Sequence, residues 1–239
     1  MSTLAGVARI PIGAAVDTVG RRGVLTASTL GVTTLVLPSG VRAASVVEPS
    51  GTPAPTVEAD ALVQTSAPTT NYGTSSLLLK NYSSLHRIGY VRFGLTDLAW
   101  VSAPAPALTL TTVQNNDNVG PYYLPTTFAV EVYGLNEDAA GYAWGESTVT
   151  WNTRPAAGSL TGGRYVPSSD ATLLGELAVP RNAYPDDCTF TSDALRTFVR
   201  GLASPSVTFI LIRKDTLNTN LAFAGREWPE GQRPALTLG

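Results

Sequence analysis

The stretch Arg87–Leu95, RIGYVRFGL, alternates between two kinds of side chain. Val91 and Phe93 fall on one face of an extended strand and Tyr90 and Arg92 on the other, because successive strand side chains point to opposite faces. This alternation predicts a β-strand that packs one face against a core. We therefore expect the chain to fold around strands of this kind.

Runs of similar length recur on both sides of this stretch, with turn-forming residues between them. Residues 207–212, VTFILI, are apolar on both faces, as in a strand at the centre of a sheet. The expected strands cover residues 56–64, 76–81, 87–95, 107–114, 128–134, 148–152, 173–179, 207–214, 221–227 and 235–238.

One segment, Ser192–Arg200, is expected to form a helix. Leu195, Phe198 and Val199 form its apolar stripe, and either of its first two residues can cap its start. Many short strands with one short helix predict an all-β fold, a jelly-roll β-sandwich in a single domain.

Composition limits the kind of partner and site. Hydrophobic residues make up 44% of the 239-residue chain and charged residues 14%, which allows a sizeable core under a neutral, polar surface. The formal net charge is -2 and the only lysines are Lys80 and Lys214, so no nucleic-acid partner is expected, because phosphate binding needs a basic face. A single cysteine, Cys188, excludes an internal disulfide, and it follows two aspartates that disfavour a thiolate, so we expect a packed thiol.

The first residues resemble an export signal. Arg21 and Arg22 precede a weakly apolar stretch at residues 26–37, and residues 41–43, VRA, place small side chains where a signal peptidase cleaves. The apolar run is too short for a membrane span, which needs about twenty residues. Residues 1–43 are therefore predicted to be a leader with a twin-arginine-type signal peptide, and the protein to be secreted and extracellular.

The remaining chain divides into a linker and a domain. Residues 44–55 are rich in Pro and contain no periodic pattern, which predicts a tether. Residues 56–239 hold the expected strands and form the predicted β-sandwich domain. The oligomeric state is left open by the sequence.

Residues 144–155, WGESTVTWNTRP, resemble the W-x-E-x-x-x-T-W-x-x-x-P signature of DNRLRE-type domains, which include carbohydrate-binding module family 96. Further pieces that resemble the family follow in its order: EAD at 58–60, NYG at 71–73, RIGYVRF at 87–93, FAGRE at 223–227 and PAL at 234–236. Gly225 stands where the family usually has Ser, and the family's Asp-Val-Thr triplet before the helix is missing.

The resemblance implies a jelly-roll sandwich of the carbohydrate-binding kind, with a polysaccharide as partner. Family 96 is associated with alginate. On physical grounds we expect Trp144 and Trp151 to plug the sandwich rather than stack on sugar, because they are large apolar side chains within or beside strands. Glu146, Arg226 and Glu227 are expected to form a buried arginine–carboxylate network that fixes the fold without touching ligand.

Two acidic residues in the first strand are candidates for a metal site. Glu58 and Asp60 are two positions apart, so both carboxylates are expected on one strand face. Jelly-roll sugar-binding modules often hold a structural calcium with first-strand carboxylates, and Ca²⁺ takes about six to eight oxygen ligands. We predict a structural calcium there, and an ordinary solvated acidic edge is the alternative.

A sugar site needs a flat aromatic ring and planar hydrogen-bond donors. Lys80, Tyr82, His86 and Arg87 combine both kinds within one predicted hairpin. Arginine binds uronate carboxylates through two parallel hydrogen bonds. These four residues are therefore the predicted ligand-binding residues.

The sequence predicts a non-catalytic protein that binds an extracellular polysaccharide, acidic and alginate-like. Two alternatives stay open. One is a structural or adhesion module of the cell surface, which the proline-rich tether fits equally well. The other is a β-sandwich polysaccharide lyase, because His86, Tyr90 and Arg92 share one strand face and such a set can take the proton beside a uronate carboxylate.

Overall fold

The computed structural model describes residues 54–95, 102, 104–114, 125–158, 166, 169–181 and 184–239, and the backbone alone of residues 24–27, 32–36 and 46–47. The chain forms two compact units, Met1–Gly51 and Thr52–Gly239. In the first unit the backbone forms three short antiparallel strands, β1 (Val24–Ala27), β2 (Val32–Val36) and β3 (Val46–Val47). Apart from these strands, the predicted leader and most of the tether lie outside the described residues, and both remain predictions.

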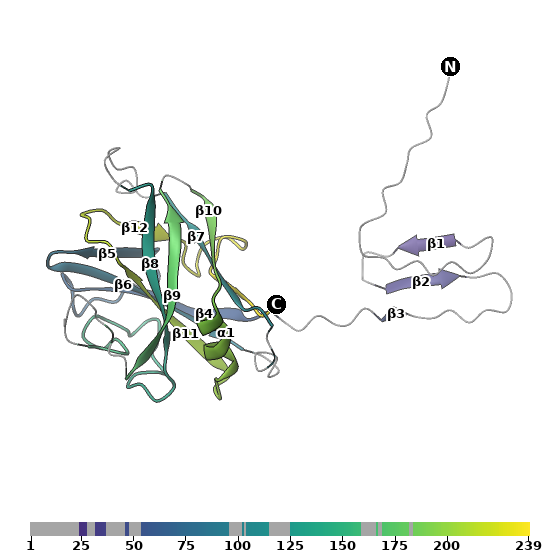
Figure 1. Ribbon diagram of the computed structural model, residues 1–239, viewed down its shortest axis with the longest axis horizontal. Helices are drawn as coiled ribbons and strands as arrows, with labels where there is room; N and C mark the ends of the chain where they lie inside the picture. Colours follow the sequence, from purple (N-terminus) through teal and green to yellow (C-terminus); the bar gives the residue numbers. More distant parts are fainter. Residues whose placement is uncertain are drawn as a thin grey trace, which may run out of the picture. The chain divides into compact units, whose positions relative to one another are not determined.

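The second unit consists of antiparallel strands and one helix (Figure 1). The helix is α1 (Asp193–Arg200). The strands are β4 (Thr56–Gln64), β5 (Leu77–Tyr82), β6 (Leu85–Gly94), β7 (Ala107–Thr112), β8 (Thr127–Leu135), β9 (Ala171–Pro180), β10 (Asp186–Phe190), β11 (Ser206–Arg213), β12 (Leu221–Phe223) and β13 (Ala235–Thr237).

The strands form two layers. The first layer has the order β4-β6-β11-β8-β9, and the second has the order β5-β12-β7, with β10 and β13 both paired to β7. β6 joins the layers, because its first residues pair with β5 and its later residues with β11. This arrangement confirms the predicted all-β sandwich with one short helix.

The main core lies between the layers and contains one face of β6, as its alternation predicts. Val91 and Phe93 are fully buried there with Phe209 and Leu211 of β11 and Leu110 of β7. The rings of Phe93 and Phe209 meet edge-on with their centroids 6.0 Å apart. Burying each large apolar side chain stabilises the fold by about 1.5–3 kcal/mol, so this face of β6 fixes the register of the first layer.

A second cluster covers the outer face of the first layer. The covering segment, residues 136–158, places Trp144 over this face, where the indole is 5% exposed. Its ring centroid lies 5.8 Å from that of Tyr90, and its Nε1–H donates to Thr208 Oγ1 at 3.1 Å. Trp144 is thus a structural plug, as expected. Trp151 is half-buried beneath the guanidinium of Arg154, which lies 3.8 Å from its ring centroid.

The strand predicted at residues 148–152 is wrong, because these residues form turns within the covering segment. The Thr150 N–H donates to Thr153 Oγ1 at 3.0 Å, and the Asn71 side chain donates to the Val149 carbonyl at 2.7 Å. Threonine hydroxyls that bond the nearby backbone give it an alternative to a strand ladder.

The predicted helix is confirmed. Ser192 is the N-cap of α1: its Oγ accepts from the Leu195 N–H at 2.9 Å and donates to the Leu174 carbonyl at 2.8 Å. Leu195 and Val199 are buried. No helix of the described residues is long and apolar enough to span a membrane.

The strand β10 was not expected from the sequence. It pairs with β7 from Asp186 to Phe190 and buries Cys188. Burial, together with the charges of Asp186 and Asp187, raises the pKa of the Cys188 thiol to about 11. The prediction of a packed thiol is therefore confirmed, since Cys188 is 5% exposed within the main core.

Candidate functional site

The β5–β6 hairpin carries all four predicted ligand-binding residues. Lys80 lies directly opposite Arg87, and Tyr82 follows two positions later on the same strand. These three side chains therefore share one face, the hairpin face, whereas His86 points to the opposite face. The sequence predicted the four residues as one patch, and the strand pairing brings three of them together.

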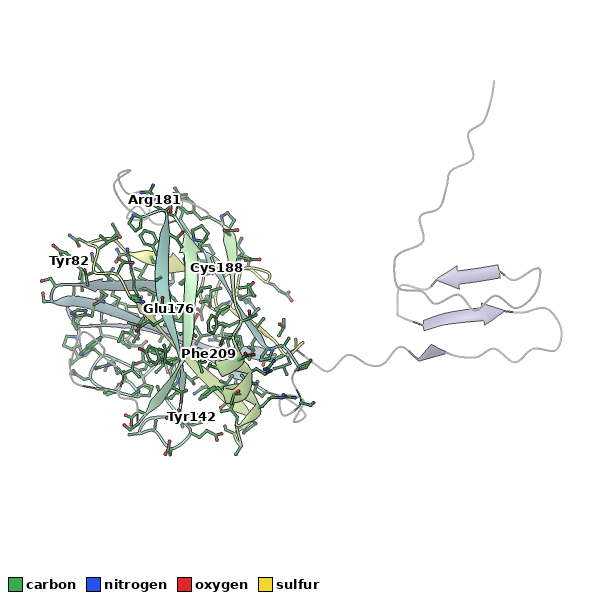
Figure 2. All side chains as sticks on the ribbon, in the orientation of Figure 1. Tyr82, Tyr142, Glu176, Arg181, Cys188 and Phe209 are labelled. Carbon is green, nitrogen blue, oxygen red and sulfur yellow. The ribbon has the colours of Figure 1, made fainter. Side chains whose placement is uncertain are left out.

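Tyr82 is the accessible member of the hairpin face. Its side chain lies at the surface of the domain (Figure 2) and is 40% exposed. Among the described residues only Leu173 on β9 is a comparably exposed large hydrophobic residue, at 42%. Lys80, in contrast, is 8% exposed. An exposed aromatic ring can stack on a sugar, and the buried Lys80 and the half-buried Arg87 place cations on the same face.

Arg87 is held by amide side chains from other parts of the chain. Its Nε–H donates to Gln64 Oε1 at 2.9 Å, and its Nη1–H donates to Asn220 Oδ1 at 2.6 Å. Gln64 in turn donates from Nε2 to the Tyr72 hydroxyl at 2.5 Å. The guanidinium is therefore fixed before any ligand arrives, which lowers the entropy cost of binding.

Asn220 reaches Arg87 because the segment after β11 is anchored. Arg213 is fully buried with its guanidinium 4.4 Å from the ring centroid of Phe128. It donates to Thr219 Oγ1 at 2.9 Å and pairs with Asp215 at 2.8 Å. Sequence analysis missed Gln64 and Asn220, because nothing in the chain order places either beside residue 87.

His86 is part of a separate environment. It is 7% exposed, and its Nδ1 lies 3.0 Å from Asn81 Oδ1. Burial lowers the pKa of His86, although a backbone hydrogen bond to Ser83 opposes this change. Above pH 6.5 the folded domain therefore favours the neutral imidazole.

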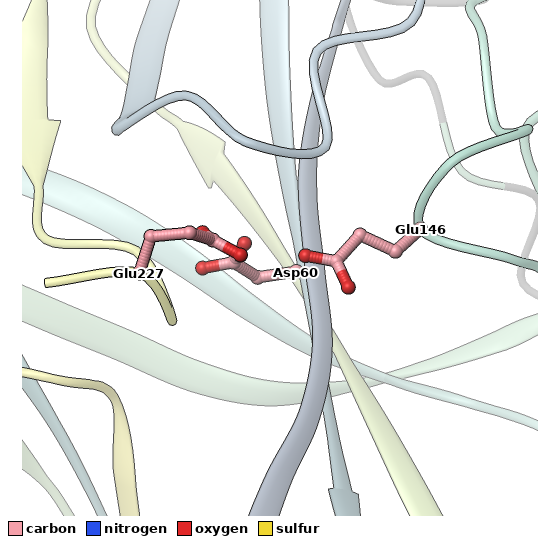
Figure 3. A group of neighbouring side chains, drawn as sticks. All are labelled: Asp60, Glu146 and Glu227. Atoms are coloured by element: carbon pink, nitrogen blue, oxygen red, sulfur yellow. The ribbon is translucent and has the colours of Figure 1, made fainter.

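Three carboxylates meet at the edge of β4. Asp60, Glu146 and Glu227 each offer one oxygen atom, and these atoms lie within 4.8 Å of one another (Figure 3). Arg226 lies beside them: it donates to Glu146 from Nη2 at 2.7 Å and from Nε at 3.3 Å, and its Nη2 is 3.3 Å from Glu227. The expected arginine–carboxylate contacts are thus present, but the network is not buried as expected, since Arg226 is 40% and Glu227 38% exposed.

The expected pair of Glu58 and Asp60 on one strand face does not form. A β-bulge between Val57 and Ala59 makes Glu58 an extra residue, which shifts the alternation of β4. Glu58 therefore lies with Arg92, 3.3 Å from its Nε, on the outer face of the first layer. Asp60 falls on the other face and is fully buried.

Asp60 is an unusual carboxylate. Its Oδ2 accepts from the Arg226 backbone N–H at 2.6 Å, whereas Oδ1 is buried and has no hydrogen-bond partner among the described residues. Burial is the main cause that raises the pKa of Asp60 to about 7. The negative charges of Glu227 and Glu146 raise this pKa further, whereas the hydrogen bond from the Arg226 backbone lowers it. Burial also raises the pKa of Glu146, against the effect of Arg226.

The lyase alternative rests on His86, Tyr90 and Arg92, and each of these side chains bonds to a different part of the domain. Tyr90 is fully buried, its hydroxyl donates to the Pro155 carbonyl at 3.1 Å, and burial raises its pKa. Arg92 donates to the Trp144 carbonyl at 2.6 Å beneath the covering segment. The covering segment therefore lies over the Tyr90 hydroxyl, whereas the side chain of Arg92 is still 21% exposed.

The second layer offers a shallow pocket that sequence analysis did not suggest. Its volume is about 410 Å³, and Thr109, Thr111, Asp187, Glu230 and Arg233 contribute to its wall. The described residues that line it include no aromatic ring. Sugar stacking is therefore better served by the hairpin face.

A comparison with domain families matches residues 53–171 to carbohydrate-binding module family 96. The matched residues include the hairpin, Asp60 and Glu146. Among curated proteins no match to the chain is found. Its sequence and its all-β sandwich make this a carbohydrate-binding module family 96-like domain.

Proposed function

We propose that the protein is a secreted, non-catalytic domain that binds an acidic, alginate-like extracellular polysaccharide through the hairpin face. The family match supports a polysaccharide as partner. The observation that carries the choice of site is the exposed ring of Tyr82 on the same hairpin face as Lys80 and Arg87.

The chemistry of the hairpin face suits an acidic sugar. The Tyr82 ring can stack on the C–H face of a pyranose, and the cations of Lys80 and Arg87 complement uronate carboxylates. Gln64 and Asn220 already orient the guanidinium through hydrogen bonds of 2.9 and 2.6 Å. The interaction therefore gains both charge complementarity and preorganisation.

Affinity electrophoresis of the full chain tests this site. We expect retardation in gels that contain alginate, less retardation for Tyr82→Ala, and unchanged retardation for Leu173→Ala, since Leu173 is equally exposed but lies on β9. Equal effects of the two substitutions would remove the hairpin face from the proposal. No retardation by alginate, pectin or any other polysaccharide would favour the structural or adhesion module.

The non-catalytic role is supported by the place of Tyr90 beneath the covering segment. Uronan solutions incubated with the chain should show no rise in ultraviolet absorbance, because no unsaturated product forms. A rise that disappears in His86→Ala would instead support the lyase.

Secretion through the twin-arginine route is part of the same proposal, and the order of features in residues 1–43 supports it. Replacing both Arg21 and Arg22 by lysine should leave the chain inside the cell. Undiminished export of that variant would contradict the route.

A further inference from the structure

Asp60, Glu146 and Glu227 come from three distant parts of the chain. Asp60 lies in β4, Glu146 in the covering segment and Glu227 in the segment after β12. Their nearest oxygen atoms lie within 4.8 Å of one another (Figure 3). Two oxygens that each lie about 2.3–2.6 Å from one Ca²⁺ are separated by at most about 5 Å, so the spacing suits that ion.

The buried oxygen of Asp60 provides an independent observation. Asp60 is 0% exposed, and its Oδ1 has no hydrogen-bond partner among the described residues. Buried carboxylate oxygens are normally hydrogen-bonded or bound to a metal ion, because an unsatisfied one loses its hydration without compensation. The unsatisfied oxygen belongs to the same carboxylate that joins the cluster.

The charge of the cluster also calls for a cation. The guanidinium of Arg226 pairs with Glu146 and Glu227. When all three carboxylates are ionised, this leaves an excess of two negative charges, which a divalent ion would neutralise. A further oxygen is close: the Ser75 carbonyl lies 3.3 Å from the position that a Cβ on Gly225 would take, and Asp60 Oδ2 lies 2.9 Å from it. Gly225 thus leaves room beside two oxygen ligands.

From these observations we infer that Asp60, Glu146 and Glu227 bind one divalent cation of the calcium class. Carboxylates on three segments and a carbonyl on a fourth fit the irregular oxygen coordination of Ca²⁺ better than the strict octahedron of Mg²⁺. The cation joins β4, the covering segment and the segment after β12. Glu58 has no part in it, since it pairs with Arg92 on the other face of β4.

Calorimetric titration of Ca²⁺ into the chelator-treated full chain tests the site, with the melting temperature as a second readout. We expect binding of one ion per chain and a melting temperature that rises with Ca²⁺ and falls again with chelator. Glu227→Gln, at a side chain 38% exposed, should fold normally and bind Ca²⁺ on the order of tenfold more weakly or worse. Asp60→Asn should lose Ca²⁺ binding in the same way.

Glu58→Gln is the matched control, because it removes a carboxylate from the same strand without touching the cluster. It should bind Ca²⁺ as the unsubstituted chain does. The inference is overturned if the unsubstituted chain shows neither Ca²⁺ binding nor a change in melting temperature. It is equally overturned if Glu58→Gln abolishes binding while Glu227→Gln and Asp60→Asn retain it.

Discussion

At Asp60, burial and charge oppose each other. Its carboxylate is fully buried beside Glu146 and Glu227, and one of its oxygens accepts from the Arg226 backbone. In the absence of a cation, the buried negative charge destabilises the fold, because desolvation and the neighbouring carboxylates both favour the protonated form. The same residue should stabilise the fold when a cation is bound.

Substitution of Asp60 by Asn should therefore change stability in opposite directions with and without Ca²⁺. Asn keeps an oxygen for the Arg226 N–H and directs an amide donor toward the carboxylates. In chelator we expect Asp60→Asn to raise the free energy of unfolding by about 1–3 kcal/mol, and in Ca²⁺ to lower it relative to the unsubstituted chain. Urea unfolding in both buffers measures this, and a loss of stability in chelator would contradict it.

His86 should make stability depend on pH. Burial lowers its folded-state pKa below the ordinary value of 6.5, so the unfolded chain binds the proton more readily. The contribution of His86 to the free energy of unfolding is complete above pH 6.5 and is lost as the pH falls below that value. The loss amounts to about 1.4 kcal/mol for each pH unit by which folding lowers the pKa. Urea unfolding between pH 7.5 and pH 5 should show a smaller loss for His86→Gln. Equal losses in both proteins would contradict the prediction.

At this scale the sequence predicts neighbours along the chain better than partners from distant segments. Lys80, Tyr82 and Arg87 are close in sequence, and a two-strand pairing is enough to bring them together. Glu58 and Asp60 failed as a pair because a single bulge shifts the alternation, and no residue type signals that bulge. Glu146 and Glu227 reach Asp60 only through folding of the whole domain.

At the scale of elements, the covering segment decides what the outer face of the first layer can do. The indole of Trp144 packs against Tyr90, and the Trp144 carbonyl accepts a hydrogen bond from Arg92. The same segment places Glu146 beside Asp60 at the edge of β4. The conspicuous signature in the sequence is therefore mainly a structural device. It leaves the β5–β6 hairpin to provide the exposed aromatic ring.

Trp144→Ala should destabilise the domain far more than Trp151→Ala. Trp144 is 5% exposed and hydrogen-bonded to Thr208, whereas Trp151 is only half-buried. Truncating a buried tryptophan costs about 3–5 kcal/mol, because it leaves a cavity and unpaired groups. Chemical unfolding of both variants provides the measurement, and equal losses would contradict the assigned role of Trp144.

The sequence predicted the elements whose side chains follow a clear period. It did not predict the turns at residues 148–152 or the short strand β10. The alternation of β6, the apolar run of β11 and the capped stripe of α1 each have a direct physical signature. Residues 148–152 resemble a strand in composition, but hydroxyl bonds close them into turns. β10 was missed because its two aspartates and its short length are typical of a loop.

At the scale of the whole molecule, β4 links the two proposed sites. Asp60 belongs to the proposed cation site, and Gln64 accepts a hydrogen bond from Arg87. The two residues are four positions apart on one face of β4, which places them about 13 Å apart. Residues 71 and 72 also connect the two sites. The Asn71 side chain donates to the Glu146 carbonyl at 2.7 Å, and the Tyr72 hydroxyl accepts from Gln64. A cation at Asp60 would therefore stiffen the scaffold on which the hairpin face is built.

The central claim is that an acidic polysaccharide binds at the hairpin face, and its most direct test is chemical-shift mapping of the folded chain with alginate oligosaccharides. The largest shifts should fall on the amides of Lys80, Tyr82 and Arg87 and on the side-chain amides of Gln64 and Asn220. Residues of α1 and of the pocket around Asp187 should not respond. Shifts confined to that pocket, or the absence of any shift at saturating oligosaccharide, would contradict the claim.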